Sequence, residues 1–503
     1  MNQAKAGQAA TVARRLPGIH DPIELHSRLG SPMLIRRTGG RSLILVDSAL
    51  RLEAVGGEAR LTAASEGGAI ILRRIAAAFA GHITRQDERE LTLRFERCDH
   101  PDEAVRAAAP SALNLIRALL SCLAPIDRDE LFAITALGLI GFDHVDMVEA
   151  LPPRPPGEFP DLIFDLAETL VVIEPGGAAR ILAMAVGSDD PGETNRHYHL
   201  AAERLQRTIS RCSTEGPLQP AAVEQTMAAK PDLDDGEFAA VVALLKEHVA
   251  AGDIFQAVPS RTFTAPCAEP IAAFRRLVAA DPSSYQFMFD CGHGLLFGAS
   301  PETAIEIRRD DGGHIVSVSP IAGTRARGAT VDQDSRNEAD LRLDAKEIAE
   351  HMMLVDLARN DIARVTRPGT RAVPRLLGVE RFAKVMHLVS TIEGQLADGY
   401  DAIDAIRACL NVGTLSGAPK LKAIELIRAV EPSARGPYGG AIGWITCDGS
   451  MDSAVVIRSA LVRDGIAEVR AGAGVVADSD PLAEAAETRA KASAVLAALG
   501  TAA

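Results

Sequence analysis

Hydrophobic positions along the chain follow two spacings, one typical of strands and the other of helices. Two apolar runs, Met33–Ile35 and Ser42–Val46, are separated by Gly39-Gly40, and this arrangement predicts two strands joined by a turn. From Ser111 to Leu123, apolar residues recur at helical spacing. The first part of the chain is therefore predicted to mix helices and strands.

A domain boundary is predicted after a second helical stretch, which runs from His197 to Cys212. A polar segment with glycine and prolines follows at 213–220, and an acidic patch follows at 232–237. Residues before Pro17 are small and polar, which is typical of a frayed terminus. We therefore divide the chain into a flexible tail (1–16), an N-terminal region (17–212), a linker (213–236) and a catalytic region (237–500).

After the linker, long amphipathic patterns alternate with short strand-like runs. The expected helices are Glu237–Ala250, Glu338–Asp361, Pro419–Ala429 and Pro481–Leu499, and the strand-like runs include Ile315–Val318, Ala454–Ile457 and Ala467–Val469. Short strands grouped between long helices predict the α+β class, with a large and mostly antiparallel sheet.

Composition and charge narrow the function classes. The 503 residues are 47% hydrophobic, which is enough for a substantial core and excludes intrinsic disorder. With 67 acidic and 53 basic residues, the net charge is −14. Because such a chain repels polyanions, nucleic acid and anionic membranes are not expected partners. An anionic substrate would need a local cluster of positive charge.

Neither a membrane span nor a secretory signal is predicted. The longest nearly apolar run, Leu131–Phe142, is well short of the roughly 20 residues that cross a bilayer. Arg14 and Arg15 are not followed by an apolar stretch, so a cytoplasmic location is expected.

The seven cysteines indicate reduced thiols rather than a disulfide framework or a zinc site, because they are odd in number and lack C-x-x-C spacing. None of them lies in a G-x-C-x-G turn, so the chain is not expected to hydrolyse glutamine itself.

Two pairs of glutamates are the clearest candidates for chemistry. Glu347 and Glu350 are three residues apart in one predicted helix, and Glu484 and Glu487 repeat that spacing in another, so each pair projects from one helix face. Carboxylates from two helices could bind a hard divalent cation, for which Mg²⁺ is the best fit. The alternative is two solvated helix faces, with Glu487 paired to Lys491.

Glycine-rich turns form a second group of candidates. Residues 413–420 precede a predicted helix, so free backbone N–H groups and a Thr or Ser hydroxyl could meet an anion there. The spacing is not that of a P-loop. Residues 471–474 would let the backbone approach a ligand, and 320–324, followed by Arg325 and Arg327, offers a hydroxyl and positive charge. Each of these turns alone could also be an ordinary turn.

Isolated candidates are Gln256, His387, Tyr438 and Arg458. A histidine in an apolar setting such as that of His387 is also typical of a hydrogen-bonded core residue. Arg458 follows a β-branched run, and an arginine there could be a buried ion-pair partner or a bidentate carboxylate clamp.

Taken together, these motifs resemble the chorismate-utilising enzymes, most closely the anthranilate synthase large subunit and its relative 2-amino-2-deoxyisochorismate synthase. The resemblance covers essentially the whole chain, more weakly before residue 230. Its motifs are Gly252–Arg261, Pro320–Arg325, Glu350–Asp361, Val385–Ser390, Gly413–Lys420, Gly436–Gly440 and Ala471–Val476.

The resemblance implies an α/β/α sandwich around large, mostly antiparallel sheets, in a protein expected to be an oligomer. It implies that Mg²⁺ is held by Glu350 and Glu487, supported by Glu347 and Glu484, and bridges a carboxylate of chorismate. The implied substrate contacts are Gly323, Thr324, Tyr438, Arg458, Gly472, Ala473, Gly474 and Lys491, with Thr414 as a further ring or backbone contact.

The implied reaction is attack of ammonia at C2 of chorismate with loss of the C4 hydroxyl, giving 2-amino-2-deoxyisochorismate. Glu302 is the candidate acid for the departing hydroxyl. His387 corresponds to the residue implicated in a second step, the elimination of pyruvate to give anthranilate, so both products remain open. Ammonia would come from a separate glutamine amidotransferase subunit or from solution.

Two positions separate the relatives by chemistry. Where water-using members need a lysine base, this chain has Gln256, which cannot deprotonate water. Where aminodeoxychorismate synthases carry a nucleophilic lysine, this chain has Ala322.

The tryptophan feedback pocket of the resembled enzymes is altered here. Its Leu-Leu-Glu-Ser motif reads Leu34-Ile-Arg-Arg37, and its second half reads Asp281-Pro-Ser-Ser-Tyr-Gln286. Two arginines in place of a carboxylate would repel the ammonium group of tryptophan. Loss of this control favours a role in specialised metabolism, such as antibiotic assembly. The competing class is a noncatalytic tryptophan-sensing or scaffold relative.

Overall fold

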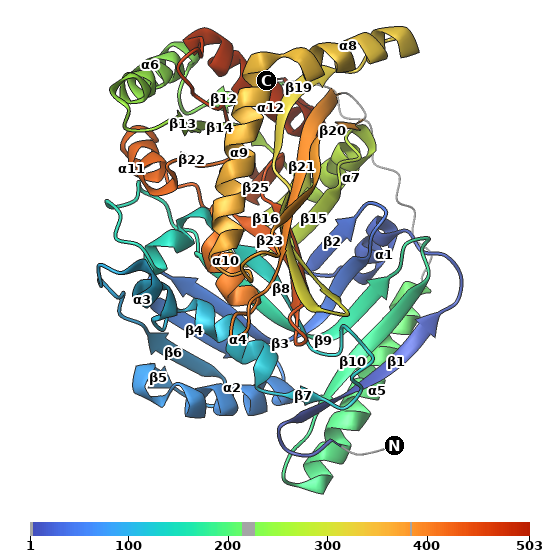
Figure 1. The fold of residues 1–503 in the computed structure, drawn as a ribbon. Helices are drawn as coiled ribbons and strands as arrows, with labels where there is room; N and C mark the ends of the chain where they lie inside the picture. The colour runs from blue at the N-terminus through green and yellow to red at the C-terminus, as the bar shows by residue number, and fades with distance from the viewer. Residues whose placement is uncertain (1–3, 214–226, 383–384, 503) are drawn as a thin grey trace.

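The computed structural model describes residues 4–213, 227–382 and 385–502 (Figure 1). The N-terminal part contains β1 (Gln8–Leu16), α1 (Pro22–Leu29), β2 (Met33–Arg37), β3 (Ser42–Val55), β4 (Glu58–Ala63), α2 (Glu66–Ala78), β5 (Ile83–Gln86), β6 (Glu90–Arg94), α3 (Glu103–Ala108), α4 (Leu113–Ser121), β7 (Ala124–Pro125), β8 (Thr135–Ile140), β9 (Leu162–Ile173), β10 (Ala179–Val186) and α5 (Pro191–Cys212).

The C-terminal part contains β11 (Met227–Ala228), β12 (Lys230–Pro231), α6 (Asp235–Ala251), β13 (Gln256–Ala257), β14 (Ser260–Pro266), α7 (Pro270–Ala280), β15 (Tyr285–Asp290), β16 (Leu295–Ser300), β17 (Thr303–Asp310), β18 (Gly313–Val318), β19 (Ile321–Ala326), α8 (Val331–Leu343), α9 (Ala345–Ala363), β20 (Ala372–Arg381), β21 (Val385–Gln395), α10 (Ala402–Cys409), β22 (Gly417–Ala418), α11 (Lys420–Val430), β23 (Ala441–Thr446), β24 (Met451–Val455), β25 (Ser459–Arg463), β26 (Ile466–Gly472), α12 (Pro481–Ala498) and β27 (Thr501–Ala502).

The predicted α+β class is confirmed. In the described part of the chain, 23 strands are connected into one extended sheet system whose long ladders are antiparallel. Figure 1 shows α2, α4 and α5 toward one end of the molecule and α6, α9, α11 and α12 toward the other. One buried cluster takes its side chains mainly from strands, such as Leu43, Leu137 and Phe287, whereas two others join helices to strands. This layering matches the predicted sandwich.

The N-terminal and C-terminal parts share their sheets. β2 pairs antiparallel with β15, and β8 pairs antiparallel with β23. The predicted boundary at 213–236 therefore separates two parts of the sequence but not two separate sheets, because strands from either side of it hydrogen-bond to each other. Most of the predicted linker lies outside the described residues, and its end already forms β11, β12 and the start of α6.

The predicted flexible tail at 1–16 is wrong for residues 8–16. These residues form β1, which pairs antiparallel with β10 from Ala9 opposite Val186 to Leu16 opposite Ala179. Ala9, Ala10 and Leu16 are buried in this strand. The prediction failed because it was based on small and polar residues in this segment alone. The strand is formed by hydrogen bonds to β10, which the local sequence does not show.

Helix α9 begins at a second N-cap inside the predicted Glu338–Asp361 helix. Asp344 ends α8 and its side chain accepts hydrogen bonds from the backbone N–H groups of Lys346 and Glu347. In the described residues, none of the helices has the length and apolar character needed to cross a bilayer.

Candidate active site

Helices α9 and α12 bring the two glutamate pairs to one place. Asp480 caps α12, with Pro481 in its first turn, and thereby sets where Glu484 and Glu487 project. Burial raises the pKa of Glu350, and the charges of Glu347 and Glu487 raise it further. Glu487 of α12 is therefore near enough to Glu350 of α9 for its charge to act on that carboxylate.

Three of the four glutamates each have a distinct basic partner. Lys346 lies 3.7 Å from Glu350, Lys491 lies 2.7 Å from Glu487, and Arg325 lies 3.1 Å from Glu347. Glu484 differs from the others, because its buried Oε2 has no hydrogen-bond partner. Burial, together with the charge of Glu487, raises the pKa of Glu484 to about 7.

These carboxylates are chemically suited to Mg²⁺, which prefers hard oxygen ligands, and the unpartnered Oε2 of Glu484 is a further oxygen for it. As the side chains lie, however, no three His, Cys, Asp or Glu residues in the described ranges form a ready metal-binding group. Lysine and arginine contacts neutralise three of the four carboxylates instead.

Lys491 lies at the centre of the predicted site. Its Nζ donates to the Gly472 carbonyl at 3.1 Å and contacts Glu487. Its charge also lowers the pKa values of Glu302, His387 and Glu484, so all three lie within its electrostatic reach. The alternative from spacing was a simple pair of Glu487 and Lys491 on a solvated helix face. This ion pair is present, and Lys491 also contacts Gly472.

Glu302 is a buried carboxyl group that is hydrogen-bonded to the half-buried Thr414. Thr414 Oγ1 donates a 2.7 Å hydrogen bond to Glu302 Oε1. Burial raises the pKa of Glu302 to about 7, although Thr414 and Lys491 both oppose this shift. A carboxyl group with this pKa is largely protonated just below neutrality and can give up a proton near it.

His387 contacts two of the predicted substrate residues. Its Nδ1 lies 3.0 Å from Thr324 Oγ1 and 3.1 Å from the Gly323 carbonyl, across the β19–β21 ladder. Burial lowers the pKa of His387 to about 4, so its ring is neutral at pH 7. Gly323 has φ of +77°, and an added Cβ would lie 3.3 Å from Glu347 Oε2. The irregularity of β19 at Gly323 therefore lies between His387 on one side and Glu347 on the other.

Tyr438, Arg458 and Gly472 form another wall. A Cβ added at Gly472 would lie 3.0 Å from the Tyr438 hydroxyl, so glycine permits this close approach. Arg458 is half-buried; burial lowers its pKa, and the charges of Asp281, Tyr438 and Glu487 oppose this shift. Its φ of +49° lies in the left-handed region. Within the described ranges, none of the acidic residues forms an ion pair with Arg458, so its guanidinium is available to clamp a carboxylate.

Gln256 faces Gly474 at the end of the site. A Cβ on Gly474 would lie 2.9 Å from Gln256 Nε2, and Gln256 Oε1 is buried without a partner. The neighbouring Ala473 N–H already donates to the Pro259 carbonyl at 3.1 Å. The Ala473 N–H, a predicted substrate contact, is therefore engaged within the protein.

The predicted turn at 320–324 is wrong, because these residues lie mostly in strand β19, with an irregularity at Gly323. The arginines of this segment are also engaged. Arg325 pairs with Asp340, Asp344 and Glu347, and Arg327 pairs with Asp334. The positive charge predicted there thus organises α8 and α9.

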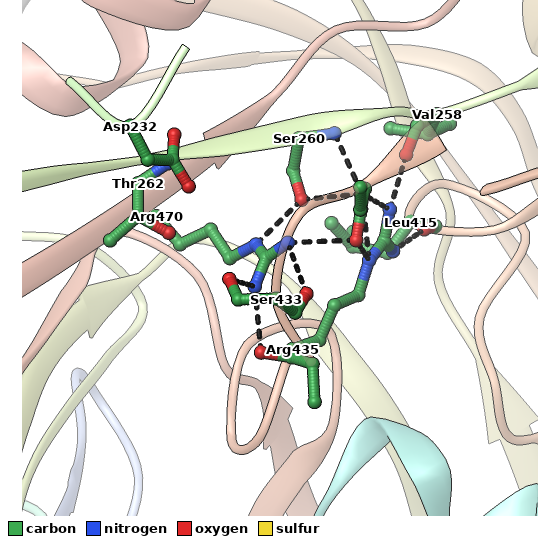
Figure 2. Close-up of polar contacts among 10 residues, drawn as sticks. Asp232, Val258, Ser260, Thr262, Leu415, Ser433, Arg435 and Arg470 are labelled. Atoms are coloured by element: carbon green, nitrogen blue, oxygen red, sulfur yellow. Dashed lines mark hydrogen bonds and ion pairs between the residues drawn. The ribbon is translucent and has the colours of Figure 1, made fainter. Parts of the chain in front are cut away.

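Sequence patterns missed the ion cluster that supports these segments (Figure 2). Glu431 is fully buried and accepts from Ser260 N at 2.8 Å, from Arg435 Nη2 at 2.6 Å and from Arg470 Nη2 at 2.8 Å. Arg435 also donates to the carbonyls of Leu415 and Val258, each at 2.6 Å. The cluster ties together the chain next to Thr414, Tyr438, Gly472 and Gln256.

A single glutamate before a proline carries no spacing signal, so Glu431 could not be singled out from the sequence. A cavity of ≈340 Å³ reaches this cluster and is lined by Arg435, Tyr438 and Arg470, among others.

The chain is similar to known proteins over nearly its full length. Residues 63–497 match the model of the chorismate binding enzyme family. Anthranilate synthase component 1 of Vibrio parahaemolyticus is 40% identical over 514 aligned residues, covering 98% of this chain and 94% of the relative. The pyocyanine-specific anthranilate synthase component 1 of Pseudomonas aeruginosa is 43% identical, covering 92% and 87%.

The fold has a solved counterpart. The crystal structure of anthranilate synthase component I from Streptococcus pneumoniae superposes with a TM-score of 0.71 at 27% identity, covering 91% of this chain and 92% of that one.

Replacement of Glu431 tests the supporting cluster. Glu431→Ala is expected to lower the free energy of unfolding by about 3–5 kcal/mol, because it leaves Arg435 and Arg470 buried without their carboxylate. Denaturant unfolding measures this change. The matched control is Asp356→Ala, which removes an exposed pair with Arg359 and should cost less than about 1 kcal/mol. Equal losses in both variants would contradict the cluster's role.

Proposed function

The chain belongs to the family of chorismate binding enzymes, and we propose that it aminates chorismate at C2 with ammonia, in a magnesium-dependent reaction that gives 2-amino-2-deoxyisochorismate. The observation that carries this proposal is the gathering of the Glu302 carboxyl group, bound by Thr414, a neutral histidine and the carboxylates of Glu484 and Glu487 around Lys491.

The buried acid suits the loss of the C4 hydroxyl. Glu302, protonated near neutral pH, gives its proton to the hydroxyl oxygen, so the group leaves as water rather than as hydroxide. Thr414 holds the carboxyl group in place. As C2 bonds to nitrogen, the ring electrons shift toward C4, and the new ammonium group loses one proton to solvent.

Two substitutions in the active site favour ammonia as the nucleophile. Gln256 has no basic group to deprotonate water, and its buried Oε1 is a hydrogen-bond acceptor without a partner. Ala322 has no nucleophilic side chain. A neutral amine nucleophile needs no base to become reactive, so this site can use ammonia where it cannot use water.

Chorismate is a dianion, and its carboxylates need positive partners in this acidic protein. Tyr438, Arg458 and Lys491 would orient the carboxylates through charge-assisted hydrogen bonds. Mg²⁺, held by Glu350 and Glu487 with support from Glu347 and Glu484, would polarise and anchor one carboxylate when bound.

Full conversion to anthranilate is the second candidate. His387 favours it, because a neutral imidazole that contacts Thr324 is suited to proton transfer during the elimination of pyruvate. Sequence identity does not distinguish the two candidate products, because the pyocyanine-specific relative is 43% identical to this chain and the relative from Escherichia coli is 42% identical.

A separate amidotransferase is the proposed source of ammonia. The relatives are named as component 1, and the chain has no cysteine in a nucleophile turn. Burial raises the pKa of the Cys409 thiol to about 12, which makes this cysteine a poor nucleophile.

Incubation of pure protein with chorismate, Mg²⁺ and ammonium tests the function directly. Mass analysis should detect an aminated, nonaromatic product without pyruvate, whereas pyruvate and a fluorescent product would favour anthranilate. Glu350→Gln is expected to abolish turnover by removing a carboxylate from the α9–α12 group. A noncatalytic scaffold would show no turnover in either protein. Control reactions use the exposed neighbour variant Ala349→Gln, which should retain activity.

The acid role of Glu302 predicts a pH dependence. Since the protonated form is the active one, kcat should fall as the pH rises above about 7. Glu302→Gln cannot donate this proton and should lower kcat by about 10²–10⁴-fold and remove the decline. The measurement is kcat against pH at a constant concentration of free ammonia. A decline that persists unchanged in Glu302→Gln would assign it to another group.

Tryptophan is not expected to inhibit the enzyme. Arg37 Nη1 lies 2.9 Å from both Glu306 and Asp452, and its guanidinium lies over the Tyr285 ring. On the paired strands, Arg36 lies opposite Gln286. Glu306 and Asp452 neutralise the charge of Arg37, so the repulsion of an ammonium group comes from Arg36 on β2. Initial rates with micromolar tryptophan should equal those with phenylalanine, and inhibition by tryptophan alone would refute this prediction.

A further inference from the structure

A small, partly open cavity lies beside the proposed acid. Its volume is ≈20 Å³, and its walls come from Glu302, from Thr414 and the chain before it, and from the face of α9 that carries Leu354 and Ala358. Leu354, Ala358 and Val412 are buried around it. A cavity needs roughly 10–15 Å³ of this kind of volume to hold one water molecule. The space therefore fits a single water-sized molecule and excludes a ring such as that of chorismate.

Polar groups stand at two sides of this cavity. Glu302 and Thr414 are joined by their 2.7 Å hydrogen bond, and Asp361 accepts a 2.9 Å hydrogen bond from Lys420 Nζ. Each carboxyl group has a second oxygen besides the one in these contacts. A buried water typically makes about three hydrogen bonds, and these groups supply both donors and acceptors. Two carboxyl groups disfavour an anion, so the cavity suits a small neutral molecule.

The reaction provides such a molecule next to Glu302. We propose that this cavity binds a single water molecule and receives the water that leaves from C4 of chorismate; this inference rests on the proposed function. The Glu302 O–H bond breaks as its proton moves to the hydroxyl oxygen, and the C4–O bond breaks with its electron pair remaining on that oxygen. The C2–N bond forms as the ring electrons shift, and Glu302 regains a proton from solvent.

The position of the cavity favours water over ammonia. The acid that protonates the C4 hydroxyl lines the cavity directly, whereas Gln256, which is proposed to face the nucleophile, does not line it. A receiving site beside the acid separates the leaving water from the ring carbon and so opposes the reverse attack.

Filling the cavity tests the proposal in the full-length protein. Ala358→Leu adds an apolar side chain to its wall, and the matched control Ala345→Leu makes the same change at the exposed start of the same helix. Ala358→Leu should lower kcat by about tenfold or more, while KM for chorismate and for ammonium stays within about twofold of the unmodified protein. Ala345→Leu should leave all three constants unchanged.

Two kinetic outcomes would overturn the assignment. An unchanged kcat in Ala358→Leu would show that the cavity has no part in turnover, and a rise in KM for ammonium alone would assign the cavity to ammonia. The unmodified protein is assayed first, and a failure to aminate chorismate at that stage would count against the proposed function before the cavity is tested.

A second measurement does not depend on a variant that folds. A high-resolution crystal structure of the unmodified protein should show one ordered water within hydrogen-bond distance of Glu302 in this cavity. A cavity without density, or one closed by a shifted side chain, would overturn the proposal.

Discussion

The buried carboxylate of Glu431 is the interaction on which the arrangement of the site depends. It lies between two guanidinium groups, and those of Arg435 and Arg470 then bind carbonyl oxygens on the separate segments that carry the site residues. One carboxylate facing two cations leaves a net positive charge in a dry region, which is costly unless every donor is used. The cluster therefore fixes the positions of these segments, because moving any of them would leave a charged donor unpaired.

A different compromise holds among the glutamates of α9 and α12. Four carboxylates from two helices repel one another, and burial of Glu350 and Glu484 raises the pKa of each. Lys346, Lys491 and Arg325 reduce this repulsion, although the chain as a whole has a net charge of −14. The charge of Lys491 also acts on Glu302 and His387. The local electrostatics thus serve stability and the binding of an anionic substrate with the same cations.

The sequence was sufficient for the helix that carries Glu487, because the Asp480 cap and a face of regular spacing define it. It was only partly sufficient for α9, because the predicted Glu338–Asp361 helix ran through the break at Asp344. It was also sufficient for the resemblance from which His387, Thr324 and Lys491 were assigned to one site. It was insufficient for β1, whose small residues owe their strand to β10, and for Glu431, whose role depends on arginines brought near by folding. Long-range pairing leaves no local pattern, and this is why both were missed.

The backbone at Arg458 shows how the shared sheet supports the site. A left-handed φ of +49° costs a residue other than glycine roughly 1–3 kcal/mol, and persists only where the surroundings enforce it. Here the Arg458 carbonyl accepts from Ala299 N at 3.1 Å, and the next residue, Ser459, begins the pairing of β25 with β16. β16 in turn pairs with β15, and β15 with β2 of the N-terminal part. The strained turn that holds the guanidinium is therefore fixed by a ladder reaching across both parts of the chain, so the N-terminal region contributes to the site without providing a residue to it.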